Sequence, residues 1–238
     1  MKKCIWILAV QLLCGIQAFA QQTDAEKLFV KLRQKIDAIK DYEASVKMKI
    51  DIAYMRVPPL NGKLYFKAPD KMKLERNGGI SILPKRSTNM ALGNLMPNQS
   101  ATVIDAGTET VNGKPLRVIK VVPNTEQGDI VLTKIWIDEQ RVLAMRTETT
   151  TRENGTIKMD LEFGKYEKQG LPDKVIFYID TKEFKIPKGV TMDYDGATKA
   201  DVEKAAAKKP KKGRIQIEYM SYTINKGLPD AIFAENKK

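Results

Sequence analysis

The stretch DIVLTKIWIDEQRVLAMRTETTTRENGTIKMDLEFGKY, from Asp129 to Tyr166, decides the fold that the sequence predicts. Its β-branched and aromatic residues predict three antiparallel strands at 130–137, 142–152 and 156–163. Asn154-Gly155 separates the last two strands, and this pair favours a tight hairpin because both residues tolerate a positive φ. We therefore expect a three-stranded meander at the centre of the chain.

Apolar residues alternate with polar ones along the third strand, at Ile157, Met159, Leu161 and Phe163. A period of two gives a strand one apolar face and one wet face. What the apolar face contacts is therefore the main question about function.

The first twenty residues predict a cleaved secretory signal peptide. Two lysines precede an apolar core that ends in the small-x-small site Ala18-Phe19-Ala20. The alternative, a short membrane helix, is disfavoured because the apolar run is too short and wrongly flanked. We expect cleavage after Ala20, a mature chain at 21–238 and export across the inner membrane.

Both cysteines, Cys4 and Cys14, lie in this segment, so the mature chain has no thiol and no disulfide. Leu13 stands before Cys14, where a lipidation site has a small residue, so we do not expect lipidation. An exported chain of 218 residues (238 minus 20) without disulfides must be held by an ordinary apolar core, and it is long enough to form one.

The formal charge of +12 becomes +10 (12 minus 2) once Lys2 and Lys3 are removed. In an exported protein this surplus favours an anionic membrane surface or cell-surface polymer as a contact and disfavours nucleic acid. A basic surface that only maintains solubility explains the charge equally well.

An amphipathic helix is predicted at the start of the mature chain. Thr23 and Glu26 form a capping box, and the helix is expected to run to about Lys40. Its apolar stripe needs a partner surface and consists of Leu28, Phe29, Leu32, Ile36 and Ile39.

The rest of the chain predicts mostly strands. We expect them at 42–54, 62–67, 71–75, 116–122, 174–180 and 214–224, and at 101–106 and 108–111 as two strands or one bent strand. The segment 81–97 predicts a loop, 198–208 a helix, and 196–212 a basic Ala/Lys-rich insertion. With roughly nine to eleven strands in sequential hairpins and no linker, we expect a single, mainly β domain: a curved antiparallel sheet with the long N-terminal helix against its inner face.

Catalytic motifs are scarce. The chain has no histidine, no phosphate-binding loop and no Gly-x-Ser-x-Gly elbow, so we expect no cofactor and no metal site. Asp160 and Glu162 share the wet face of one strand, as a glycosidase pair could. Solvated carboxylates on a strand are far commoner, so we expect a protein that is not an enzyme.

A binding protein needs only a shaped apolar surface. Flexible methionines suit a surface that accepts variable chains, although any single methionine more often fills a core. The candidate ligand contacts are Leu32, Ile36, Met48, Ile50, Trp136, Met145, Ile157, Met159, Leu161, Phe163 and Met220.

The run GKLYFKAPDKMKLE at 62–75 resembles the glycine, aromatic strand, proline turn and second strand of the outer-membrane lipoprotein carrier and sorting proteins, the LolA-like family. The strand KIWID at 134–138, the hairpin RTETTTRENG at 146–155 and Leu171-Pro172 follow in similar order. The resemblance covers most of the mature chain, and each motif is loose.

The resemblance implies an unclosed half-barrel with helices on its concave face and a cavity that binds acyl chains. It implies a periplasmic protein that carries or sorts lipoproteins toward the outer membrane, and we expect a monomer. The carriers have an arginine before the turn proline that helps to latch the lid; here Ala68 holds that position. The load-and-release cycle of a dedicated carrier is therefore not implied.

Three hypotheses remain open: a lipid- or lipoprotein-binding protein, a sensor or protein-interaction module with the same fold, and a carboxylate hydrolase. A continuous apolar void on the order of several hundred Å³ favours the first. A close-packed interior favours the second.

Overall fold

The computed structural model describes residues 23–52, 55–56, 59–76, 101–125, 128–152, 155–179 and 213–234. The signal peptide expected at 1–20, the loop at 81–97, the helix at 198–208 and the insertion at 196–212 lie outside these residues. In chain order the described elements are α2 (Asp24–Asp37), β1 (Asp41–Ile52), β2 (Met55–Arg56), β3 (Leu60–Lys67), β4 (Lys71–Arg76), β5 (Ala101–Val111), β6 (Lys114–Pro123), β7 (Ile130–Asp138), β8 (Leu143–Thr151), β9 (Gly155–Glu162), the 3-10 helix η3 (Glu167–Gln169), β10 (Lys174–Ile179), β11 (Gly213–Ile224) and the 3-10 helix η4 (Asp230–Phe233).

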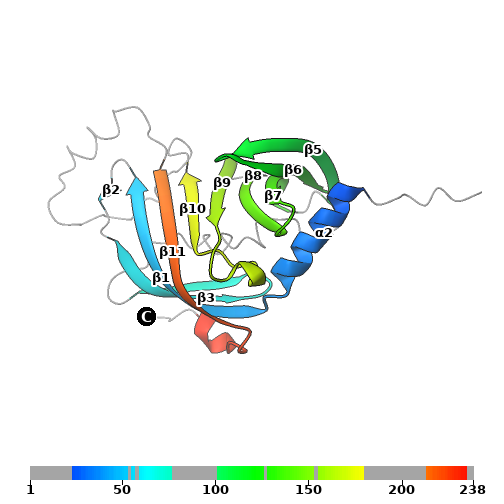
Figure 1. Cartoon of the computed structure of the whole chain (residues 1–238). Helices are drawn as coiled ribbons and strands as arrows, with labels where there is room; N and C mark the ends of the chain where they lie inside the picture. Colours follow the sequence, from blue (N-terminus) through cyan, green and yellow to red (C-terminus); the bar gives the residue numbers. More distant parts are fainter. Residues whose placement is uncertain are drawn as a thin grey trace, which may run out of the picture.

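Ten strands form one antiparallel sheet in the order β4-β3-β1-β11-β10-β9-β8-β7-β6-β5, and β2 pairs with β1 beside this path. Within the described ranges the end strands β4 and β5 do not pair with each other, so the sheet is open. Figure 1 shows that it curves strongly, with α2 beside the half that ends in β5. The expected mainly β chain with an open, curved antiparallel sheet is confirmed.

The turn between β5 and β6 is formed by two residues that tolerate a positive φ. Asn112 and Gly113 join β5 to β6 with φ values of 51° and 76°, the combination that a two-residue type I′ turn requires. β5 is one bent strand, because its register with β6 shifts between Asp105 and Thr108, where Gly107 has a φ of 80°. This resolves the alternative that the sequence left open.

Helix α2 begins where its capping residues predict. The Glu26 backbone N–H donates to Thr23 Oγ1 (3.2 Å), and the Thr23 backbone N–H donates to Glu26 Oε2 (2.7 Å). The helix ends at Asp37, earlier than the expected Lys40. Lys35, near its end, donates to the Arg141 carbonyl oxygen (2.9 Å), and Arg141 pairs with Glu167 (3.1 Å), so α2 is fastened to two loops of the sheet.

The pairing of β1 with β11 brings the two ends of the described chain together, with Tyr42 opposite Ile224. The buried Asp41 carboxylate accepts hydrogen bonds from the Lys226 N–H (2.9 Å) and the Gly227 N–H (3.1 Å). The Lys40 N–H donates a hydrogen bond to the side-chain oxygen of Asn225 (2.7 Å), a residue with a φ of 53°. This group of hydrogen bonds fixes the junction of α2, β1 and β11.

Candidate functional site

One face of the sheet carries an almost continuous row of apolar side chains from β7 to β1. Directly opposed residues on neighbouring strands point to the same side. The register gives the row Ile135, Thr147, Met159, Phe177, Ile215 and Ile50. We call this side the apolar face.

Two buried clusters cover the apolar face. The helix cluster packs α2 on β6, β7 and β8, and consists of Ala25, Leu28, Phe29, Leu32, Ile119, Val121, Ile135, Ile137 and Ala144. The larger one, here the β1–β9 cluster, consists of Ile39, Tyr42, Ala44, Val46, Met48, Ile50, Leu64, Met159, Leu161, Leu171, Val175, Phe177, Ile215 and Ile217. Among the described residues, no side chain of α2 belongs to this second cluster.

Aromatic side chains close the β1–β9 cluster at the junction of β1 and β11. The ring of Tyr222 lies 5.3 Å from Tyr42, 5.1 Å from Tyr219 and 5.0 Å from Tyr166, centre to centre. The Tyr222 hydroxyl donates to the Pro172 carbonyl oxygen (2.7 Å). Burial raises the pKa of Tyr42, Tyr219 and Tyr222, so these hydroxyls remain neutral and act as hydrogen-bonding groups.

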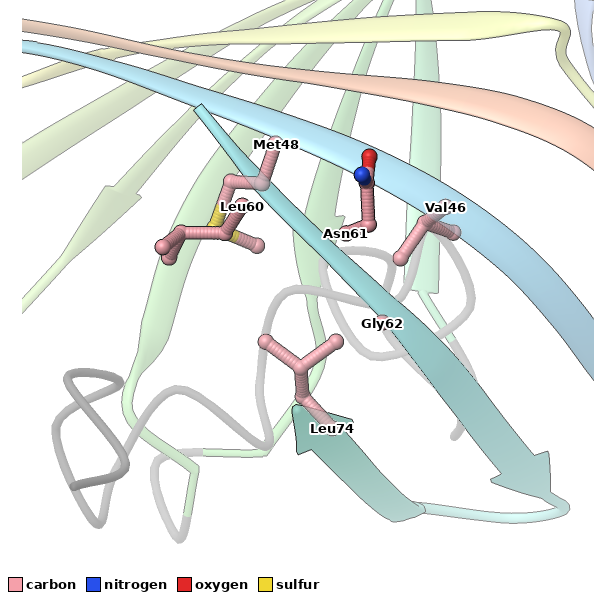
Figure 2. Close-up of a pocket in the computed structure, with 6 residues that line it drawn as sticks. All are labelled: Val46, Met48, Leu60, Asn61, Gly62 and Leu74. Atoms are coloured by element: carbon pink, nitrogen blue, oxygen red, sulfur yellow. The ribbon is translucent and has the colours of Figure 1, made fainter. Parts of the chain in front are cut away.

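A small apolar pocket opens at the edge of the β1–β9 cluster, with an empty volume of about 170 Å³ that includes space open to solvent. Figure 2 shows its lining from three neighbouring strands: Val46, Met48, Leu60, Asn61, Gly62 and Leu74. Gly62 is required there, because a Cβ at this position would lie 2.5 Å from the Glu75 carbonyl oxygen. Almost none of this space admits a water-sized sphere, so the pocket is far smaller than the several hundred Å³ typical of ligand pockets.

The opposite side, here the polar face, is joined by cross-strand ion pairs. Arg146 donates to Asp160 through two nitrogens (2.5 and 2.9 Å), and this hydrogen bonding raises the pKa of Arg146. The Tyr178 hydroxyl also donates to Asp160 (3.0 Å). Glu162 pairs with Lys174 (2.6 Å). Each carboxylate of the candidate hydrolase pair therefore has its own cationic partner.

Trp136 lies on the polar face in a third, smaller cluster with Leu116 and Val118, and it is 3% exposed. Its indole N–H donates to Glu109 (2.8 Å), and the Lys134 ammonium lies 4.3 Å from its ring centre. The hydrogen bonds from Lys134 and Trp136 lower the pKa of Glu109.

The eleven candidate contacts occupy four environments. Met48, Ile50, Met159 and Leu161 are buried in the β1–β9 cluster, and Ile157 and Phe163 pack against it. Leu32 belongs to the helix cluster, with Ile36 packed against it. Trp136 and Met145 lie in the cluster on the polar face, and Met220 is 65% exposed.

Met145 and Met220, the two candidate methionines outside the clusters of the apolar face, are extra residues in β-bulges. Arg146 opposes Trp136 while Ala144 opposes Ile137, so Met145 has no opposite partner. In the same way Ser221 and Tyr219 oppose consecutive residues of β1, and Met220 is skipped. Strict alternation cannot locate such a residue.

Several buried residues of the apolar face were not among the candidates, namely Val46, Val175, Phe177, Ile215 and Ile217. For Val46, Ile215 and Ile217 the signal was present, because β1 and β11 alternate in the sequence, whereas β10 is apolar on both sides and alternation cannot assign Val175 and Phe177 to a face. Pairing, which the sequence does not give, places all five on the apolar face with Met159.

Ala68, expected from the resemblance to replace an arginine, lies in the turn between β3 and β4. The Ala68 N–H donates to the Lys40 carbonyl oxygen (2.7 Å), which ties the turn to the start of β1. The preceding Lys67 donates to the Leu228 carbonyl oxygen (2.8 Å) and to Asp230 (2.7 Å). Lys67, directly before this turn, therefore fastens the C-terminal segment to β3.

No family model and no curated protein sequence matches the chain. Solved structures do match. A domain from Vibrio parahaemolyticus, described as an outer membrane lipoprotein-sorting protein domain, is 9% identical with a TM-score of 0.52, over 87% of this chain and 94% of that one. A LolA superfamily protein from Nitrosomonas europaea is 10% identical with a TM-score of 0.50, over 87% and 97%.

The chain has a LolA-like fold. A DUF1329 family protein from Desulfovibrio piger is similar to the same degree, with 13% identity and a TM-score of 0.50 over 87% of this chain and 95% of that one. The LolA-like fold confirms the resemblance found in the sequence. At these identities the likeness concerns the fold.

In the described part of the chain, no helix combines the length and the apolar composition that crossing a membrane requires. The same residues contain no group of three or more Asp, Glu, His or Cys side chains placed to hold a metal ion.

Proposed function

We propose that this protein is a periplasmic lipid- or lipoprotein-binding protein that shields acyl chains against the apolar face of its open sheet. The observation that carries the proposal is the β1–β9 cluster, which extends over strands β9, β10, β11, β1 and β3 without a side chain of α2. An open sheet with one broad apolar face and no described catalytic cluster fits binding better than catalysis. The ion-paired states of Asp160 and Glu162 give the hydrolase hypothesis no support.

In this proposal the apolar face is the concave side of a half-barrel and α2 is part of its cover. The acyl chain lies along the β1–β9 cluster and enters from the pocket beside β3 and β4. The candidate contacts that suit this path are Met48, Ile50, Ile157, Met159, Leu161 and Phe163. Leu32 and Ile36 border it from the helix, whereas Trp136, Met145 and Met220 are assigned no ligand contact.

A whole acyl chain needs more room than the pocket of about 170 Å³ offers, so binding must enlarge it. Transfer of each methylene from water contributes about 0.8 kcal/mol, which can offset the repacking of flexible side chains. Met48 and Met159, 2% and 1% exposed, are suited to this because a thioether side chain adopts several rotamers at low cost.

The cellular role follows by analogy. The LolA-like fold is shared with a domain described as lipoprotein-sorting, and the predicted signal peptide directs export. We propose that a single copy carries or sorts acylated lipoproteins toward the outer membrane. The charge of +10 assists contact with an anionic membrane surface.

The test is the binding of a fluorescent fatty-acyl probe to delipidated protein, with two methionine variants as a matched pair. Met159→Ala removes a buried contact on the apolar face and should weaken binding about tenfold, as expected for the loss of about 1.4 kcal/mol of apolar contact. Met220→Ala removes an exposed side chain and should leave binding unchanged. If the probe does not bind, or both variants behave alike, the proposal is wrong.

The small pocket favours a second candidate, a periplasmic sensor or protein-interaction module that carries no lipid. Pull-down from a periplasmic extract before and after delipidation separates the two candidates. A stoichiometric protein partner that survives delipidation, together with no probe binding, supports the second candidate.

A further inference from the structure

Four buried threonines interrupt the apolar face between the helix cluster and the β1–β9 cluster. They lie on β7 and β8 and are 0 to 8% exposed: Thr133, Thr147, Thr149 and Thr151. Thr147 stands directly between Ile135 of the helix cluster and Met159 of the β1–β9 cluster. The hydroxyls therefore form a short polar strip in the middle of an apolar surface.

Three of the four hydroxyls have partners within the protein. The hydroxyls of Thr133 and Thr149 lie 3.4 Å apart, and the Thr151 hydroxyl donates to the Gly155 carbonyl oxygen (3.1 Å). Thr147 differs, because its hydroxyl is fully buried and has no partner among the described residues. A buried hydroxyl that forms no hydrogen bond lowers stability.

Valine could replace Thr147 with little change in shape. Valine has almost the same shape as threonine and prefers β-strands, so it would fill the same space without an unpaired donor. Thr150, three residues later on the same strand, has a hydroxyl with a partner. It lies on the polar face, and its hydroxyl pairs with that of Thr156 (3.1 Å). Thr147 is thus a donor presented to the apolar face.

We propose that Thr147 donates a hydrogen bond to the ester carbonyl oxygen of a glycerol-linked acyl chain. This inference rests on the proposed function and adds where the ligand's polar end lies: the ester sits at the threonine strip and the chain extends along the β1–β9 cluster. Because Thr147 is fully buried, the ligand must displace neighbouring side chains to reach it. Met159, its cross-strand neighbour, is flexible enough to move.

The experiment compares two competitors for the fatty-acyl probe: a diacyl phosphatidylglycerol and its dialkyl ether analogue, which has the same chains and headgroup but no carbonyl. Wild-type protein should prefer the ester by about fivefold, the effect of one hydrogen bond between neutral groups. Thr147→Val should remove the preference while the ether still binds. Thr150→Val, the matched control on the other face, should keep it.

A second competitor and a second variant test the same hydrogen bond. A diacylglyceryl-cysteine peptide carries the same esters, so its affinity relative to the phospholipid shows which source of the ester the protein favours. Thr147→Ser keeps the hydroxyl and should keep the preference. If Thr147→Val does not fold, the infrared band of an isotope-labelled ester carbonyl should still shift to lower frequency on binding to wild-type protein.

The outcomes are distinct. Failure of every lipid to displace the probe overturns the proposed function and this inference with it. Equal binding of ester and ether by wild-type protein, a preference that survives in Thr147→Val, or an unshifted carbonyl band overturns the inference and leaves the proposed function standing.

Discussion

Replacement of Asp41 by alanine should destabilise the protein strongly, because this carboxylate holds the junction between β1 and β11. Asp41 is 6% exposed and accepts hydrogen bonds from the backbone N–H groups of Lys226 (2.9 Å) and Gly227 (3.1 and 3.2 Å). A hydrogen bond to a charged group contributes about 1.5–3 kcal/mol. Partial access of water to the two N–H groups reduces the loss, so we expect about 3 kcal/mol.

Equilibrium urea unfolding measures this loss. With an m value of about 3 kcal/mol/M for a chain of this size, the midpoint should fall by about 1 M. Asp41→Asn keeps one acceptor oxygen and should lose about half as much.

Asp37→Ala is the matched control, because its carboxylate is 54% exposed and pairs with Arg33 one turn away. Its effect should stay within about 0.5 kcal/mol. If Asp41→Ala costs no more than Asp37→Ala, the hydrogen bonds at the junction do not hold β1 against β11 and the reasoning fails.

Three further predictions concern stability. Gly62→Ala should cost about 1–3 kcal/mol in urea unfolding, because its Cβ would meet the Glu75 carbonyl oxygen; an unchanged midpoint contradicts this. Thr147→Val should raise the free energy of unfolding by about 1 kcal/mol, since it removes an unpaired buried hydroxyl, and a lower midpoint would count against that interpretation. Burial raises the pKa of Tyr219 and Tyr222, so stability is fully present below the unfolded pKa of about 10 and should fall above it, by about 1.4 kcal/mol per pH unit for each residue; flat midpoints between pH 9 and 11 contradict this.

The sequence predicted strands well because most of them have one buried side and one solvated side. The third strand of the central meander is the clearest case: Met159 and Leu161 alternate with Asp160, and all three lie on the expected sides of β9. The capping box at Thr23 likewise located the start of α2, because its hydrogen bonds are local.

Strand pairing was harder to predict from the sequence, because it depends on contacts between distant segments. β1 pairs with β11 across more than 160 residues, and nothing local in either strand indicates this partner. Trp136 shows a second reason. It is flanked by Ile135 and Ile137, so the strand is apolar on both sides and alternation cannot tell which side belongs to the apolar face.

β-Bulges explain why two expected ligand contacts, Met145 and Met220, lie outside the clusters of the apolar face. Met145 and Met220 were chosen because apolar methionines in β-rich segments suit an apolar surface, yet each is the extra residue of a register shift. A bulge depends on the twist that neighbouring strands impose, so the sequence of one strand does not reveal it. The apolar face therefore had to be defined from the pairing.

The most direct measurement is photochemical labelling of the purified protein with a photoreactive fatty acid, with the attachment sites mapped by mass spectrometry. Binding along the β1–β9 cluster predicts adducts on β1, β9 and β10, at or beside Met48, Met159 and Phe177. Labelling confined to the polar face or to the exposed Met220, or no labelling that excess unlabelled fatty acid suppresses, would contradict acyl-chain binding by the apolar face.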